Sequence, residues 1–175
     1  MRRAVFLDRD GVINVRAPEG QYVTSWEEFH FLPQVAAAIA LLNEAHFTAI
    51  VVSNQRCVAK GLIAQEDLEV MHQRMVHHLS GAKARIEAVY YCPHDNEPRC
   101  TCRKPAPGML IWAAKEHSLD LSESWMVGDS DIDIAAGKSA GCRTVRIVSP
   151  GLPPKVAAEL TAVSLYDAAR KLTSI

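Results

Sequence analysis

Residues 4–14 read AVFLDRDGVIN, and this stretch decides how the rest of the chain is organised. Its first four residues are apolar, which is typical of a short strand buried on both faces of a sheet. The run ends at two acids, Asp8 and Asp10, and Gly11 then allows the backbone to turn away. In an extended backbone the two carboxylates project to the same side, about 7 Å apart along the chain. The stretch therefore predicts a buried strand with paired acids at its carboxyl end.

Four more apolar runs follow, separated by helix-length segments, and this alternation predicts a doubly wound α/β fold with a parallel sheet. We expect strands at residues 4–7, 48–52, 88–91, 124–127 and 144–147. We expect helices at residues 33–44, 65–79, 107–117, 132–140 and 165–172, and one more in the alanine-rich segment after Pro154. Gly141 stands where a glycine cap would end one of these helices.

Two long segments, residues 14–32 and 92–106, fit no regular element, and such stretches in a compact domain are usually functional. The connections leave no room for a large cap domain. We therefore expect residues 1–175 to form a single domain with an open pocket.

The composition excludes several classes of protein. With 49% hydrophobic and 22% charged residues, the chain has a soluble globular composition, and its net charge of −1 argues against a protein that coats nucleic acid. The longest apolar run, residues 35–42, is too short to cross a bilayer, and the charges at residues 8–10 interrupt any signal-peptide core. We expect a cytoplasmic monomer that binds neither nucleic acid nor membranes.

Polar side chains follow the expected strands where they end. Asp8 and Asp10 follow the first strand, Ser53 the second and Asp129 the fourth, while Lys104 follows the third at a distance. Because ligands bind beyond the carboxyl ends of parallel strands, we expect these side chains to converge. Close carboxylates need a cation or a proton, and hard oxygen ligands suit Mg²⁺.

This set of residues suggests phosphoryl transfer. One aspartate would act as nucleophile and the other as acid and base, while the lysine and the hydroxyl hold the phosphoryl oxygens. The alternative is that each aspartate is a turn residue or a helix N-cap. That alternative suits a lone Asp-x-Asp pair, but not acids that recur at the ends of separate strands.

Cys92, His94, Cys100 and Cys102 give the spacing C-x-H-x5-C-x-C. Three thiolates and one imidazole meet the four-coordinate demand of structural zinc. A disulfide or unrelated thiols are the alternatives, and a reducing compartment disfavours the disulfide. A zinc ion here would fix the loop that runs into Lys104.

The order of these motifs resembles that of the haloacid dehalogenase-type phosphatases over roughly residues 4–148. The matching motifs are FLDRDGVIN at residues 6–14, Ser53-Asn54-Gln55, Lys104, and Gly128-Asp129 with Asp133. The resemblance implies the Rossmann-like fold of that superfamily and an aspartyl-phosphate intermediate. It would make Asp8 the nucleophile and Asp10 the general acid, and then the base for water. Asp8, Asp129 and the backbone carbonyl of Asp10 would hold Mg²⁺. Ser53 and Lys104 would bind the transferring phosphoryl group, and Asp133 would orient its neighbours.

The segments YYCPH at residues 90–94 and CRKPAPGM at residues 102–109 resemble the zinc-loop group of the superfamily, subfamily IIIA. This resemblance implies a phosphatase that acts on a small sugar bisphosphate, with heptose 1,7-bisphosphate, cleaved at its 7-phosphate, as the expected substrate. Histidinol phosphate is the alternative within the group. A binding module for a phosphorylated ligand, without turnover, is the rival from another class. The intact Asp8 and Asp10 pair argues against that rival.

A sugar bisphosphate carries a second phosphate, which a loop arginine should meet. Arg103 is the best-placed candidate because it precedes Lys104 in the zinc loop and its guanidinium fork suits phosphate. Arg56, after the second motif, is a weaker candidate, and Asn54 and Gln55 are also expected to bind substrate.

The histidines outside the zinc loop have no ligand spacing, and we expect them to be surface or packing residues: His30, His46, His72, His77, His78 and His117. Cys57 and Cys142 are expected to be small buried hydrophobes.

Overall fold

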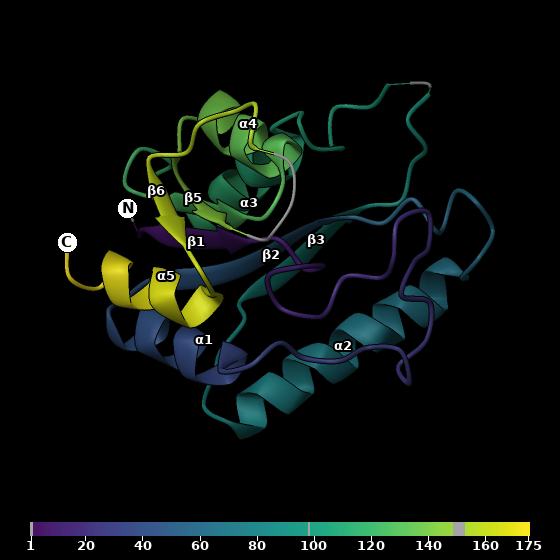
Figure 1. Cartoon of the computed structure of the whole chain (residues 1–175), viewed down its shortest axis with the longest axis horizontal. Helices are drawn as coiled ribbons and strands as arrows, with labels where there is room; N and C mark the ends of the chain where they lie inside the picture. The colour runs from purple at the N-terminus through teal and green to yellow at the C-terminus, as the bar shows by residue number, and fades with distance from the viewer. Residues whose placement is uncertain (1, 98, 149–152) are drawn as a thin grey trace.

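The computed structural model describes residues 2–97, 99–148 and 153–175, and it contains a six-stranded sheet (Figure 1). The strand order is β3-β2-β1-β4-β5-β6, and every neighbouring pair is parallel. The strands are β1 (Ala4–Leu7), β2 (Thr48–Asn54), β3 (Ala88–Cys92), β4 (Trp125–Gly128), β5 (Arg143–Ile147) and β6 (Leu160–Ala162).

Helices cover both faces of this sheet (Figure 1). The helices are α1 (Val35–Glu44), α2 (Gln65–Gly81), α3 (Gly108–His117), α4 (Asp131–Ala140) and α5 (Leu165–Leu172). Side chains alternate across each strand, so Val5 and Leu7 pack in the core under α1, α2 and α5, while Ala4 and Phe6 pack under α3 and α4. This confirms the doubly wound α/β fold that the apolar runs predict.

The central position of β1 determines where a ligand can bind. Leu7 at the end of β1 is in register with Val51 of β2 and with Val127 of β4. The residues that follow these strands therefore meet at one edge of the sheet. The strand order also changes direction at β1, and ligands of open α/β sheets bind at such a point.

The expected elements are found with small shifts at their ends. Helix α1 begins at Val35 and not at residue 33, because Gln34 has a left-handed backbone with φ of 59°. Strand β2 continues to Asn54, which pairs with Cys92 on β3. Gly141 ends α4 with φ of 86°, as expected of a glycine cap.

The prediction of an alanine-rich helix after Pro154 is wrong. The chain makes bends there and then adds β6 to the sheet. The backbone N–H groups of Lys155 and Val156 donate to the carboxylate of Asp131, and the carbonyl of Val156 accepts from Arg146. A helix would need the carbonyl of Val156, which accepts from Arg146 instead, and these tertiary bonds outweigh the helix propensity of alanine.

Residues 14–32 are largely irregular, as expected, apart from isolated bridges at Asn14 and Phe31. In the second segment, Cys92 ends β3 and the described residues after it form no helix or strand. Val23 and Phe29 anchor the first segment in the core below the sheet. In the described residues, no cap domain interrupts the sheet and its helices. Nor do any of the described helices have the length and apolar character needed to cross a bilayer.

Candidate active site

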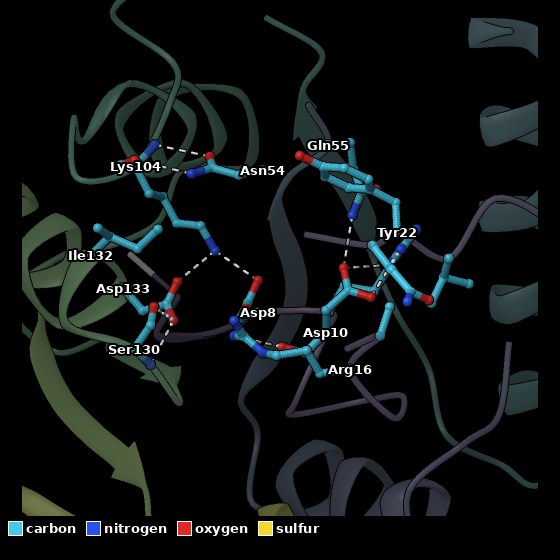
Figure 2. Close-up of a pocket in the computed structure, with 14 residues that line it drawn as sticks. Asp8, Asp10, Arg16, Tyr22, Asn54, Gln55, Lys104, Ser130, Ile132 and Asp133 are labelled. Carbon is cyan, nitrogen blue, oxygen red and sulfur yellow. Dashed lines mark hydrogen bonds and ion pairs between the residues drawn. The ribbon is translucent and has the colours of Figure 1, made fainter. Parts of the chain in front are cut away.

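The buried ammonium group of Lys104 is the centre of the cluster at the carboxyl edge of the sheet (Figure 2). Its Nζ lies 2.8 Å from Oδ1 of Asp8, 2.7 Å from Oδ1 of Asp133 and 2.8 Å from the carbonyl oxygen of Val52. Burial alone would lower the pKa of Lys104, but the charges of Asp133 and Asp8 raise it above its ordinary value. The lysine is therefore charged, and it joins three segments that are distant in sequence.

Asn54 places Lys104 by holding its backbone. The Asn54 Nδ2 donates to the Lys104 carbonyl at 3.0 Å, and the Lys104 N–H donates to the Asn54 Oδ1 at 3.0 Å. Lys104 reaches the sheet from an irregular segment, and this pair of bonds fixes it to the end of β2. Sequence reasoning expects Asn54 to bind substrate, and the structure adds that its amide is already engaged.

Asp133 is fixed by the first turn of α4. The Ser130 N–H donates to Oδ2 of Asp133 at 3.1 Å as part of a capping box, and the Ser130 hydroxyl donates to the same oxygen. The second oxygen of Asp133 is then turned to Lys104. Gly128 allows this approach, because a Cβ on it would lie 2.1 Å from the Cβ of Asp133.

Three carboxylates crowd around the end of β1. Asp8, Asp129 and Asp133 can each place one oxygen so that all three lie within 4.8 Å of one another. Burial, together with the charges of Asp133 and Asp129, outweighs the attraction of Lys104 and raises the pKa of Asp8 to about 7. The cluster therefore has more negative charge than its lysine balances, and it favours a further cation.

Arg16 shows where this cation would lie. Its guanidinium Nη2 donates both to the carboxylate of Asp129 and to the main-chain carbonyl of Asp10, the latter at 3.2 Å. Gly11, with φ of 91°, keeps the cradle open, because a Cβ on it would lie 2.0 Å from Oδ2 of Asp129. The donors that surround this place, with Asp8 beside them, are hard oxygens, and they fit Mg²⁺.

The carboxylate of Asp10 is turned away from this cradle. Its Oδ1 accepts from Arg9 Nη2 at 3.0 Å and from Asn14 Nδ2 at 2.9 Å, and its Oδ2 accepts from Arg9 Nε at 3.2 Å and from Gln55 Nε2 at 3.0 Å. Burial alone would raise the pKa of Asp10, but the charge of Arg9 and these hydrogen bonds hold it below its ordinary value. Of the residues expected around Mg²⁺, Asp10 therefore offers only its main-chain carbonyl.

Gln55 links this acid to Ser53. The Gln55 Nε2 that donates to Asp10 also donates to the Ser53 hydroxyl at 2.7 Å. Cys57, which is buried as expected, donates its thiol to Oε1 of Gln55 at 3.4 Å. Ser53 and Gln55 are themselves buried at the end of β2, so the second motif supports the acid and the lysine together.

The four zinc-ligand candidates lie together. The sulfurs of Cys92, Cys100 and Cys102 are 3.2 to 3.6 Å apart. Nδ1 of His94 is 3.4 Å from the Cys92 sulfur and 3.2 Å from the Cys102 sulfur. None of the five cysteines is joined in a disulfide in the structure. Zinc–sulfur bonds of about 2.3 Å in a tetrahedron place sulfurs about 3.8 Å apart, so the cluster is close to the size that zinc requires.

Two adjoining hollows open beside the catalytic candidates. The first, of about 190 Å³, is lined by Asp8, Asp10 and Tyr22 (Figure 2). The second, of about 470 Å³, is lined by Arg103 and by other residues of the zinc loop, and both hollows share Lys104. Arg103 also donates to the carbonyl of His94 at 3.3 Å. The structure therefore brings Arg103 to the edge of the site.

Arg56 is not brought there. Its Nε pairs with Oδ1 of Asp95 at 2.5 Å, and it is not among the described residues that line either hollow.

Sequence reasoning missed Arg9 and His72. Arg9 is 1% exposed, and its Nη1 lies 3.2 Å from Nε2 of His72. Burial and the charge of Arg9 lower the pKa of His72 to about 3, against weaker opposing effects of Asp10 and Glu69. His72 is therefore a neutral acceptor. It lies on the buried face of α2 next to Met71, and the helical spacing of that face is the one signal that could have separated it from the exposed histidines.

The parallel sheet, with Asp8, Lys104 and Asp129 at its carboxyl edge, has the fold and site of a haloacid dehalogenase-like hydrolase, and a family model described as HAD-hydrolase-like matches residues 101–151. The chain is 40% identical over 147 residues to the D-glycero-beta-D-manno-heptose-1,7-bisphosphate 7-phosphatase of Rhodopseudomonas palustris, with 80% of each chain covered. It is 35% identical over 174 residues to the protein of that name from Vibrio cholerae, covering 95% of this chain and 92% of that one.

A solved structure gives the same relationship. The D,D-heptose 1,7-bisphosphate phosphatase from B. bronchiseptica, complexed with magnesium and phosphate, has a TM-score of 0.87 to this chain at 31% identity, covering 98% of both chains. The chain therefore belongs to the heptose 1,7-bisphosphate phosphatase family of the haloacid dehalogenase-like hydrolases.

The neutral state of His72 predicts a pH dependence of stability. The folded protein keeps His72 unprotonated down to about pH 3, whereas the unfolded chain binds a proton near its ordinary pKa of 6.5. Stability is thus present at neutral pH and lost as the pH falls below about 6.5, with a slope approaching about 1.4 kcal/mol per pH unit. We expect His72→Gln to remove this contribution. Urea unfolding of both proteins from neutral pH downwards measures the difference, and parallel curves would contradict the prediction.

Proposed function

We propose that this chain is a magnesium-dependent phosphatase that hydrolyses D-glycero-D-manno-heptose 1,7-bisphosphate at the 7-phosphate. The observation that carries the chemistry is the contact of the buried Lys104 ammonium with Asp8, beside the cradle at Asp129. The substrate is proposed from the relatives, whose names specify this bisphosphate and the phosphate that is removed.

The residues divide the reaction into two steps. A carboxylate oxygen of Asp8 attacks phosphorus, and the bond between phosphorus and the sugar oxygen breaks. Asp10, whose contacts with Arg9 favour its ionised form, first takes up a proton from solvent and then gives it to that oxygen. Asp10 then takes a proton from water, which attacks the aspartyl phosphate and releases phosphate and Asp8. Lys104 and the Ser53 hydroxyl bind the transferring phosphoryl group and balance its charge.

Mg²⁺ would be held by the carboxylates of Asp8 and Asp129 and by the carbonyl of Asp10. When bound, it supplies positive charge that neutralises the nucleophile and the phosphoryl oxygens. Arg16, which occupies this place, would move aside. The crowding of carboxylates that raises the pKa of Asp8 is the property of this chain that supports the assignment.

Zinc would be held by Cys92, His94, Cys100 and Cys102, and its role would be structural because no position remains for water. The loop that these residues close leads directly into Arg103 and Lys104. Zinc would therefore order both the phosphoryl-binding lysine and the arginine proposed for the second phosphate.

The remaining parts of the proposal concern the whole molecule. We treat residues 1–175 as a single domain that acts as a monomer in the cytoplasm. Histidinol phosphate remains the alternative substrate. A comparison of kcat/KM on the two anomers of the heptose bisphosphate and on histidinol phosphate decides between them, and a higher value on histidinol phosphate would reject the proposed substrate.

Asp8→Asn should abolish turnover while the fold and the zinc content stay intact, because an amide is a poor nucleophile and a weaker ligand for Mg²⁺. Phosphate release in the presence of Mg²⁺ measures the loss. Asp67→Asn, at an exposed position on α2, is the matched control and should keep full activity. Retained turnover in Asp8→Asn would reject the covalent mechanism. It would also contradict the alternative of a binding module without turnover.

Cys102→Ser should lose zinc, lower the melting temperature and reduce activity, because Lys104 loses the loop that carries it. Metal analysis of the purified protein should give about one zinc per chain for the wild type. Cys142→Ser changes a buried cysteine outside the cluster, and it controls for the loss of a thiol as such. Equal zinc content in the two variants would contradict the site.

Arg103→Ala should reduce kcat/KM on the bisphosphate by about 10- to 100-fold, the ~1.5–3 kcal/mol of a hydrogen bond to a charged group. An aryl monophosphate has no second anion, so its turnover should change much less. Arg85→Ala, at an exposed arginine remote from both hollows, is the control. An equal loss on both substrates would mean that Arg103 serves the reacting phosphate or the loop fold.

A further inference from the structure

The carboxylate of Asp10 is saturated with hydrogen bonds, and two of the four come from one residue. Arg9 donates through Nε to one oxygen and through Nη2 to the other, so its planar fork fixes the plane of the carboxylate. Asn14 and Gln55 each hold a single oxygen. Loss of the Arg9 fork would leave each oxygen with one neutral hydrogen bond, and it would remove the only one of the three partners that holds both oxygens with a single rigid group.

The guanidinium of Arg9 is itself held by contacts with residues of α2. Its side chain is 1% exposed, and Asp10 is its carboxylate partner within the described residues. The remaining nitrogen, Nη1, points to Nε2 of His72 at 3.2 Å and to the sulfur of Met71 at 3.9 Å. A buried guanidinium with an unpaired N–H is costly, so the imidazole of His72 stabilises the rotamer of Arg9 that meets Asp10.

The chain of contacts runs from α2 through Arg9 to the reacting end of β1. His72 lies on α2 and is 4% exposed, and its ring contacts that of Tyr91 on β3 at 5.4 Å between centroids. Of Arg9, His72 and Tyr91, Arg9 alone lines one of the two hollows described above. The direct contact of His72 with a residue that lines the site is therefore its contact with Arg9.

We propose that Arg9, fixed by His72, is a positioning residue that aims the carboxylate of Asp10, and that α2 thereby supports the acid–base part of the reaction. The inference rests on the proposed function, in which Asp10 gives a proton to the leaving oxygen and takes one from water. Both transfers need the same carboxylate at a defined place and angle. Binding of substrate does not need it.

The test compares His72→Leu with His72→Gln. Leucine removes the nitrogen acceptor for Arg9 and leaves only the weak Met71 sulfur, whereas the Gln side-chain oxygen can replace Nε2 of the imidazole. His77→Leu, at an exposed histidine one turn further along α2, controls for the substitution of histidine by leucine on this helix. We expect His72→Leu to lower kcat on a sugar phosphate about tenfold, a part of the ~10²–10⁴-fold that an acid–base group contributes. KM should change less than about twofold, and His72→Gln should recover most of kcat.

An aryl phosphate separates this effect from general damage to the site. Its phenolate leaves without an acid, so the first step should keep its rate in His72→Leu, while hydrolysis of the aspartyl phosphate slows. Rapid mixing should then give a burst of phenol followed by slow steady-state release. Equal kcat values in the Leu and Gln variants, or an equal fall of burst and steady-state rates, would overturn the inference.

Crystal structures of the two variants give a readout that does not depend on turnover. In His72→Leu the Arg9 guanidinium should rotate and lose one of its two bonds to Asp10, and in His72→Gln both bonds should remain. An unchanged fork in His72→Leu would overturn the inference even if the protein proved to have no phosphatase activity. Absence of phosphate release by the wild type would instead reject the proposed function, and the two failures are thus distinguishable.

Discussion

The buried charge of Lys104 is the constraint on which the site depends. Its ammonium group has three partners, and they come from β1, β2 and the first turn of α4. Removing such a charge from water is expensive unless good partners surround it, so the lysine can be buried only when all three elements are in place. Two sets of hydrogen bonds keep these partners in place. Asn54 holds the backbone of Lys104, and Ser130 turns the carboxylate of Asp133 towards it.

The sheet could be predicted from the sequence because its strands are short apolar runs that end in polar residues, and five of the six were expected. The sixth, β6, could not be, because no local pattern specifies it. The backbone before it is held by Asp131 and Arg146, residues from α4 and β5, and a local reading of alanine-rich sequence predicts a helix instead. Tertiary bonds therefore decided the one element that was wrong.

The residues of the site likewise include some that could be predicted from the sequence and some that could not. The carboxylates, the lysine and the cysteines were found because each lies at a strand end or in a tight motif. Arg9 was passed over because arginine is usually exposed, and its burial follows from α2 and Phe29 packing over it, which the sequence does not reveal. Arg56 pairs with the surface acid Asp95 in the structure, so its contact with substrate stays a prediction.

The strand order has a consequence for how the chain is made. Ribosomes deliver the chain from its N-terminus, and β1, which emerges before the other five strands, is one of the two central strands. It can pair with β2 early, but its other edge stays open until β4 at Trp125–Gly128 has been translated. Of the residues in the cluster, the acids of residues 129–133 are translated last. Lys104 therefore stays hydrated until its final partner, Asp133, has been made. Until β4 has been made, the nascent sheet therefore carries an open edge at β1, and the cluster around Lys104 closes only when the second half of the sheet docks.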